Sequence, residues 1–161
     1  MRKLLFLVTM ACLIGVFATA APAWASSSPD QVVGVAGSGT LGQFGNPKVT
    51  VNAAQTPVNP GGWFTIGYPD GTFVMGIATC VFVSGNTAYL TGRIFISSGP
   101  RQRPNGWFIG RYLVIGVKGN GTTSTNLLNF SPGFAVNPGC GPNAAATPEF
   151  PIVSGIYRVF G

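Results

Sequence analysis

The fold is decided by residues 72–97, which read TFVMGIATCVFVSGNTAYLTGRIFIS. Residues 87–97 alternate, and successive side chains of a strand point to opposite faces of a sheet. The side expected to face the core carries Ala88, Leu90, Gly92, Ile94 and Ile96, and the side expected to face water carries Thr87, Tyr89, Thr91, Arg93, Phe95 and Ser97. Residues 72–83 are equally rich in β-forming residues, and the intervening Ser84-Gly85-Asn86 is a short connection of the kind that closes a hairpin. The stretch therefore predicts an antiparallel pair of strands.

Residues 107–118 predict a third strong strand. One side of it would carry the apolar residues Trp107, Ile109, Leu113, Ile115 and Val117. Arg111 interrupts this row. Either Arg111 lies near the exposed end of the strand, or a bulge at Gly110 shifts the register.

The rest of the chain has no apolar residues at helical spacing after the first 25 residues, and glycine, proline and asparagine punctuate it throughout. Shorter strands are predicted at residues 31–38, 48–53, 63–68, 126–130 and 153–160. The total of about eight strands predicts an all-β fold, either an antiparallel β-sandwich or a small β-barrel.

The composition argues against most enzyme chemistry. The 161 residues include no histidine and only three acidic side chains, which are Asp30, Asp70 and Glu149. General acid–base catalysis needs groups that change protonation near the working pH, and few are present. Asp70 belongs to a Tyr-Pro-Asp-Gly turn sequence. We therefore predict that the protein is not an enzyme; a small hydrolase that uses Asp70 and Glu149 is the less favoured alternative.

Residues 1–25 have the organisation of a secretory signal peptide. Arg2 and Lys3 precede an apolar run over residues 4–18, and small residues stand at the positions expected before a cleavage site after Ala25. The predicted organisation is thus a signal peptide at residues 1–25 and a single secreted β domain at residues 26–161. Cleavage would leave seven basic and three acidic side chains, a net charge of +4.

Two cysteines remain after residue 25, Cys80 and Cys140. In an oxidising compartment an even count most simply indicates one disulfide. Neither a CxxC motif nor a histidine is present to complete a metal site, so we expect no metal and no cofactor. Residues 137–151 carry four prolines around Cys140, and proline cannot donate to a sheet ladder. We therefore expect a long loop that the disulfide ties to the strand at residues 72–83.

Residues 76–92, GIATCVFVSGNTAYLTG, resemble a pattern in a family of small secreted actinobacterial β proteins. In that pattern a strand that ends in a cysteine and a hydrophobic pair is followed by a Gly-Asn-x-Ala turn and a strand that ends in glycine. Residues 112–117 and 154–159 are similar to the family's remaining strands, and Cys140 stands where a second cysteine often falls. The resemblance implies an exported β fold and no defined activity. Members often carry an Asp-rich turn where residues 118–122 here read KGNGT, so no ion-binding role is carried over.

Residues 37–42, GSGTLG, match the GxGxxG pattern of dinucleotide sites. Such a site needs a helix that starts at the glycines and an acidic residue about 20 positions further on. Pro47 follows closely, residues 48–51 turn to a β pattern, and the region near Pro60 has no carboxylate. We interpret the segment as a glycine-rich strand end or bulge and expect no nucleotide.

Two groups of residues are candidates for binding. Residues 98–106, SGPRQRPNG, are predicted to form a hairpin tip that holds Arg101 and Arg103, with Arg93 and Arg111 on the adjoining strands and Trp107 at its base. Arginines beside an aromatic ring suit anionic polymers, although a solvated loop that keeps the protein soluble is the simpler interpretation. Separately, the aromatic residues Trp63, Tyr68, Trp107 and Tyr112 could form a platform for sugars, or fill the core.

These features predict a non-catalytic interaction or structural module that is secreted and either extracellular or associated with the cell wall. The alternative is a module that binds carbohydrate or an anionic cell-wall polymer, and a protein inhibitor is a further possibility. The expected partners are a cell-wall polysaccharide or a secreted protein. Nucleic acid is not expected, because two arginines in one loop and a net charge of +4 fall short of a nucleic-acid footprint. No membrane span is expected after signal cleavage.

Overall fold

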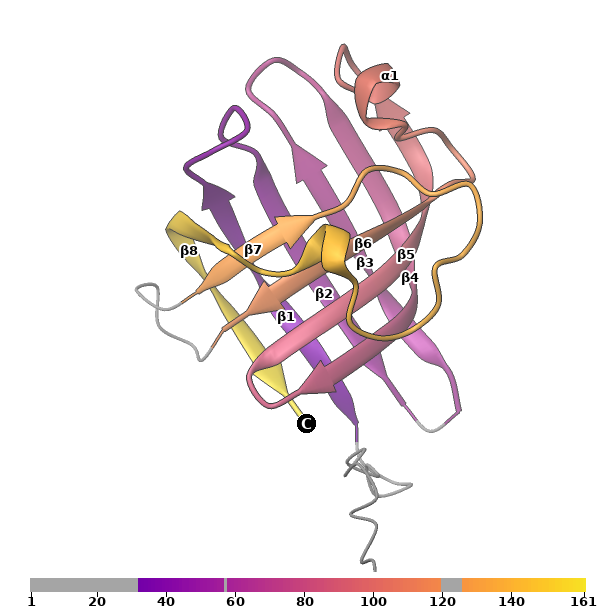
Figure 1. Ribbon diagram of the computed structural model, residues 1–161, viewed down its shortest axis with the longest axis vertical. Coiled ribbons are helices and arrows are strands. Elements are labelled where there is room, and N and C mark those ends of the chain that lie inside the picture. The colour runs from indigo at the N-terminus through magenta and orange to yellow at the C-terminus, as the bar shows by residue number, and fades with distance from the viewer. Residues whose placement is uncertain (1–31, 57, 120–125) are drawn as a thin grey trace, which may run out of the picture.

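Eight antiparallel strands follow one another around a closed barrel, and the last strand pairs with the first (Figure 1). The computed structural model describes residues 32–56, 58–119 and 126–161. The predicted signal peptide and residues 120–122 of the KGNGT turn lie outside the described residues. The strands are β1 (Val33–Leu41), β2 (Lys48–Gln55), β3 (Pro60–Gly67), β4 (Phe73–Ser84), β5 (Thr87–Ser98), β6 (Tyr112–Lys118), β7 (Leu127–Phe130) and β8 (Phe150–Phe160).

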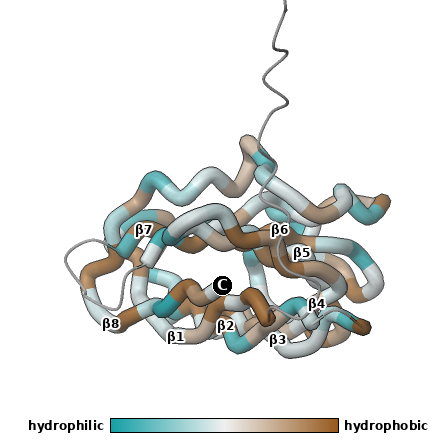
Figure 2. The backbone as a smooth tube through the Cα atoms, turned by 90° about the horizontal axis from the view of Figure 1, so that it is seen from below, coloured by the Kyte–Doolittle hydropathy of each residue, from teal (hydrophilic) through white to brown (hydrophobic). Residues whose placement is uncertain are grey.

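All eight expected strands are present, and the all-β prediction is confirmed. Of the two architectures, the structure adopts the barrel, because β8 pairs with β1 over residues 34–41. Seen along its strands, the barrel encloses its interior, and the connection between β7 and β8 lies outside β6 and β5 (Figure 2). Closure satisfies most of the sheet edges, although the seam between β7 and β8 is short, with only Leu127–Pro151 and Leu128–Phe150 paired among the described residues.

The core fills the barrel interior with aliphatic side chains and aromatic rings, and two of these rings, Phe64 and Tyr157, pack against glycines. The Phe64 ring occupies the space above Gly76 and Gly92, where an added Cβ would lie within 2.4 Å of the ring. Tyr157 is fully buried, lies against Gly37 and Gly39, and donates a hydrogen bond from its hydroxyl to the Val49 carbonyl at 2.7 Å. Glycines at these positions therefore make room for the two rings, as alternation of small and large residues does in small barrels.

Strand β5 departs from strict alternation at one point. Ala88, Leu90 and Ile94 are buried as predicted, but the expectation that Ile96 faces the core is wrong, because its side chain is exposed. Gly76 pairs with Ile94 while Met75 pairs with Ile96, so Phe95 is an extra residue in the ladder. Such a β-bulge changes the face of the residues that follow it.

Strand β6 begins later than predicted. Residues 107–111 are not part of it: Gly110 has a φ of 88°, and Ile109 is exposed rather than aligned with the buried Trp107. The two explanations for Arg111 were a position near the exposed end of the strand and a bulge at Gly110; in the structure Arg111 lies at the strand end, directly before Tyr112, and Gly110 belongs to the preceding turn. The connection from β5 also contains a short helix, α1 (Gln102–Asn105), where the sequence predicted only a hairpin tip.

The connection between β7 and β8 covers the outer face of β6 and part of β5. Gly116 lies against the Ala146 carbonyl, and Thr91 donates a hydrogen bond to the Gly139 carbonyl at 2.8 Å. Thr91 was expected to face water, and this cover explains its burial. The predicted pairing of Cys80 with Cys140 is present at disulfide distance, with Cα atoms 5.6 Å apart. As expected, the long loop is tied to the strand that carries Cys80.

The glycine-rich motif lies in β1, which agrees with its interpretation as a strand end with a bulge. The register against β8 shifts between Thr40 and Leu41, and after Gly42 the chain turns and enters β2 at Lys48. Among the described residues, no helix has the length and apolar character that crossing a bilayer requires.

Candidate functional site

A pocket of about 240 Å³ opens at the end of the barrel where four connections meet. These connections join β1 to β2, β3 to β4, β5 to β6 and β7 to β8, and three of them lie at the top of Figure 1. The pocket is lined by Phe44, Tyr68, Arg101, Asn105, Trp107, Asn129, Phe130, Ser131 and Pro132. Its residues therefore come from segments that are far apart in the sequence.

Trp107 supplies a rigid floor. Its side chain is 1% exposed, and its indole N–H donates to the Ser131 carbonyl at 3.3 Å. Its ring lies 5.9 Å from the Tyr68 ring and 5.7 Å from the Phe130 ring, in the range of favourable aromatic pairs. The Ser131 hydroxyl in turn accepts a hydrogen bond from the backbone N–H of Val114 at 3.0 Å. The Trp107 ring is thus held in place by its packing against Tyr68 and Phe130 and by its hydrogen bond to Ser131.

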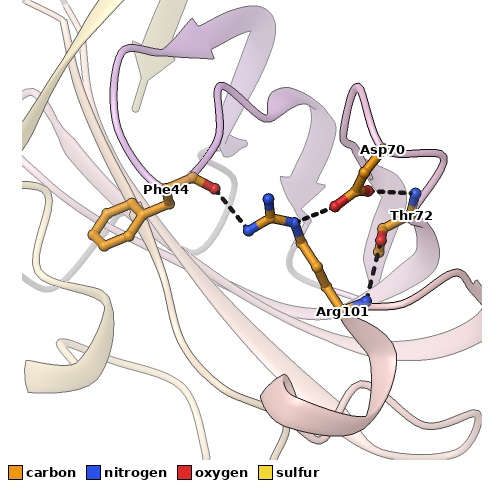
Figure 3. A network of polar contacts seen from close by, with 4 residues as sticks. All are labelled: Phe44, Asp70, Thr72 and Arg101. Atoms are coloured by element: carbon orange, nitrogen blue, oxygen red, sulfur yellow. Dashed lines mark hydrogen bonds and ion pairs between the residues drawn. The ribbon is translucent and has the colours of Figure 1, made fainter.

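Arg101 crosses the rim of the pocket and joins three connections (Figure 3). Its Nε lies 2.6 Å from Oδ2 of Asp70, and an Nη atom donates to the Phe44 carbonyl at 3.1 Å. The guanidinium carbon lies 4.4 Å from the centre of the Tyr68 ring. The Thr72 hydroxyl accepts from the backbone N–H of Arg101 at 3.2 Å, and the Thr72 backbone N–H donates to Oδ1 of Asp70 at 2.9 Å. Arg101 therefore links its own connection, between β5 and β6, to the β1–β2 and β3–β4 connections.

The ionisable groups at the rim have shifted pKa values. The backbone hydrogen bond from Thr72 and the hydrogen bond from Arg101 lower the pKa of Asp70. Burial raises the pKa of Tyr68 to about 12, an effect that Arg101 opposes and Asp70 reinforces. At neutral pH the rim thus holds a carboxylate already paired with a guanidinium, and a neutral phenol.

Two side chains at the pocket keep polar atoms for a ligand. Among the hydrogen bonds found between described residues, none involves the Tyr68 hydroxyl or the side-chain amide of Asn105, whereas the Asn105 backbone N–H donates to the Arg101 carbonyl at 3.2 Å. Asn129 is different, because its amide donates to the Thr147 carbonyl at 3.0 Å and its carbonyl oxygen accepts from the Phe130 N–H. The aromatic surface open to a ligand comes from the exposed Phe44 and the half-buried Phe130, because Tyr68 and Trp107 are only 7% and 1% exposed. The Asn105 side chain lies beside them, with Asn129 held in place by its own hydrogen bonds.

Comparison with known proteins identifies no relative. No protein-family model, no curated protein and no solved structure matches this chain. The resemblance to secreted actinobacterial β proteins therefore stays a prediction. Among the described residues, no group of three or more histidine, cysteine, aspartate or glutamate side chains is placed to hold a metal ion.

Some of the predicted binding residues line the pocket, and the others lie elsewhere on the barrel. Arg101 and Trp107 line the pocket, together with Tyr68 of the proposed aromatic platform. The other residues lie outside the pocket: Arg103 on α1, Arg93 on β5, Trp63 on β3, Tyr112 on β6, and Arg111 just before β6. Trp63 and Tyr112 face outward on the barrel wall, in one cross-strand row with Arg93 between them. The four aromatic residues therefore do not form a single platform.

Several pocket residues were not identified from the sequence. Phe44 is the clearest, because it has a φ of 57° and adopts the left-handed conformation that is rare for bulky residues. Its ring meets the Phe150 ring edge-on, with centres 4.8 Å apart. A turn-rich segment, QFGNP at residues 43–47, was the only sequence signal for it. Asn105 lay within the highlighted loop but carries no motif of its own.

Proposed function

We propose that the protein is a non-catalytic extracellular binding module that takes one neutral, polyhydroxylated ring, such as a sugar unit of a polysaccharide, in the pocket at the barrel end. The observation that carries the proposal is the combination of aromatic lining residues with two polar side chains, Tyr68 and Asn105, that form no side-chain hydrogen bond with the described part of the chain. Apolar ring faces of a sugar pack on aromatic surfaces, and its hydroxyls exchange hydrogen bonds with amide and phenol groups.

The size of the pocket supports a single ring. Its volume of about 240 Å³ lies below the ~300–1,000 Å³ of pockets that hold drug-sized ligands. A longer polymer would therefore extend out of the pocket across the surrounding connections.

The charge distribution favours a neutral ligand over an anion. Among the described residues that line the pocket, Arg101 alone is charged, and its guanidinium is already engaged with Asp70, Phe44 and Tyr68. An anion would compete with the Asp70 carboxylate at short distance, and like charges oppose its binding.

The titratable side chains of the pocket favour ligand binding without catalysis. The titratable groups of the lining are the braced Arg101 and Tyr68, whose pKa of about 12 keeps the phenol protonated near neutral pH. General acid–base catalysis works best with a pKa near the working pH. The Cys80–Cys140 pair is in keeping with an oxidising, extracellular location.

The proposal can be tested by calorimetric titration of the purified protein with neutral hexoses, N-acetylhexosamines and their short oligomers. Co-sedimentation with insoluble polysaccharides at low and high salt extends the test to polymers. We expect binding that survives high salt, because aromatic packing and neutral hydrogen bonds are little screened. Asn105→Ala should weaken binding about tenfold, because it removes a hydrogen bond to a sugar hydroxyl and the contact of the Asn105 side chain with the sugar ring.

Arg103→Ala is the matched control, because Arg103 lies on the same short helix and does not line the pocket. It should bind like the unmodified protein. Absence of binding to every sugar, or equal binding by the Asn105→Ala variant, would refute the pocket as a sugar site. Binding that disappears at high salt and needs Arg103 would instead assign an anionic polymer to the arginine-bearing loop.

A further inference from the structure

Part of the outer barrel wall carries large apolar side chains that nothing in the described chain covers. We call this surface the apolar wall, and its main residues are Trp63, Phe73, Ile77, Phe95, Ile96 and Ile109. Ile77 is 51% exposed and Ile109 is 66% exposed. The connection between β7 and β8 covers β6 and part of β5 and reaches β4 at Cys80 through Cys140. It leaves the side chains of the apolar wall exposed.

The strand register makes the apolar wall continuous. Trp63 pairs directly with Ile77, and Ile77 pairs directly with Arg93. The bulge in β5 adds to the surface, because it leaves Phe95 and Ile96 both exposed. Directly opposed residues on one face of a sheet lie close enough for their side chains to touch. A contiguous apolar surface on a water-exposed wall marks an interaction site more often than chance.

Arginines accompany the apolar wall, and carboxylates do not. The Arg93 guanidinium reaches the Gly110 carbonyl, next to Ile109, with an N···O distance of 3.4 Å. Arg111 lies 5.3 Å from the centre of the Phe108 ring in the same turn. Within the described ranges the acidic side chains are Asp70, which is paired with Arg101, and Glu149, which precedes β8. The surface is therefore apolar and positively charged.

This combination disfavours a second copy of the chain as the occupant. A symmetric dimer would place the apolar wall against itself and bring its arginines together without a carboxylate to pair with them. The strands that carry most of the apolar wall, β3, β4 and β5, are each paired with a neighbour on both sides, so this wall does not offer a free strand edge to an extended peptide. An occupant must instead present both apolar and anionic groups. It must also bind a curved surface through side-chain contacts, without backbone hydrogen bonds.

We propose that the apolar wall docks the protein on the surface of a bilayer that contains anionic lipids. Trp63, Phe95 and Ile109 would enter the interface between headgroups and acyl chains, where aromatic and aliphatic side chains are favoured. Arg93 and Arg111 would meet the lipid phosphates, since basic residues near an anionic surface add to binding. Docking would leave the pocket end of the barrel beside the membrane, and it does not depend on what the pocket binds.

The test is co-sedimentation of the purified protein with two kinds of vesicle. One is phosphatidylcholine alone, and in the other about a third of the lipid is phosphatidylglycerol. We expect clear binding to the anionic vesicles, weak binding to the neutral ones, and a decrease for both Arg93→Gln and Arg111→Gln. Ile109→Ser and Ile77→Thr should each reduce partitioning about tenfold, because each removes methylene and methyl groups from the interface.

Val153→Thr and Arg158→Gln are the matched controls, because Val153 is 65% exposed and both residues lie on β8, away from the apolar wall. They should bind vesicles like the unmodified protein. No preference for anionic vesicles, or equal losses in the wall and control variants, would overturn the proposal. So would sedimentation equilibrium that shows a dimer which Ile77→Thr dissociates, since a second copy would then occupy the wall.

Discussion

Arg101 Nε lies 2.6 Å from Asp70 Oδ2, although 31 residues separate them in the sequence. The ion pair joins the β3–β4 turn to the connection that carries α1, and the same guanidinium binds the Phe44 carbonyl in the β1–β2 connection (Figure 3). A pair at a surface adds little to stability by itself. Its importance here is positional, because it holds three parts of the pocket rim in register.

The stability of the fold should depend on the ionisation of Asp70. Hydrogen bonds from Thr72 and Arg101 lower the pKa of Asp70 in the folded protein. The carboxylate therefore stabilises the fold at pH values above its unfolded pKa, and that contribution is lost as the pH falls through the folded pKa. Urea midpoints measured from about pH 7 to about pH 2 should differ most between the unmodified protein and Asp70→Asn at neutral pH. A difference that does not shrink below about pH 4 would contradict this role.

Removal of the cysteine pair should lower stability substantially. The pair closes a loop of 60 residues, and the chain-entropy model gives about 4 kcal/mol for a loop of that length. The Cys80→Ala/Cys140→Ala double variant should therefore show a lower free energy of unfolding in denaturant titrations. A thiol assay on the unmodified protein, purified without reductant, should find neither cysteine free. Two reactive thiols without reductant would exclude the bridge.

Gly92 should not tolerate a side chain. An added Cβ would lie 2.4 Å from the Phe64 ring and 2.7 Å from the Ile77 carbonyl oxygen. We expect Gly92→Ala to cost about 1–3 kcal/mol of stability through overpacking. Gly67→Ala is the control, because its Cβ would meet no atom closer than 3.9 Å. Addition of Phe64→Leu to Gly92→Ala should recover part of the loss, and strictly additive effects would argue against the contact.

The Tyr157 hydroxyl should contribute to the core by its hydrogen bond. Its donation to the buried Val49 carbonyl links β8 to β2 across β1. Tyr157→Phe should cost about 1–2 kcal/mol, because the carbonyl would lose its donor inside the barrel. Tyr89→Phe, on the outward side of β5, should change stability by less than about 0.5 kcal/mol. Chemical denaturation of both variants measures the difference, and equal values would contradict the role.

The sequence predicted the strands better than the site. Alternation along residues 87–95 and turn residues such as Gly85-Asn86 are local signals, and the corresponding strands are present. The errors occur where distant contacts override the local pattern. The bulge against β4 exposes Ile96, and the turn at Gly110 removes Trp107 and Ile109 from the strand. Only Arg101 and Trp107 of the six predicted binding residues line the pocket.

The sequence by itself determined the all-β class, the number of strands with their approximate positions along the chain, and the pairing of Cys80 with Cys140. Period-two alternation, turn residues and the cysteine count are readable from neighbours along the chain. Only the tertiary structure decided that the sheet closes and that Phe44, Asn105 and Ser131 meet at one end. The physical reason is that closure depends on hydrogen bonds between the first and last strands, and these determine which distant connections converge.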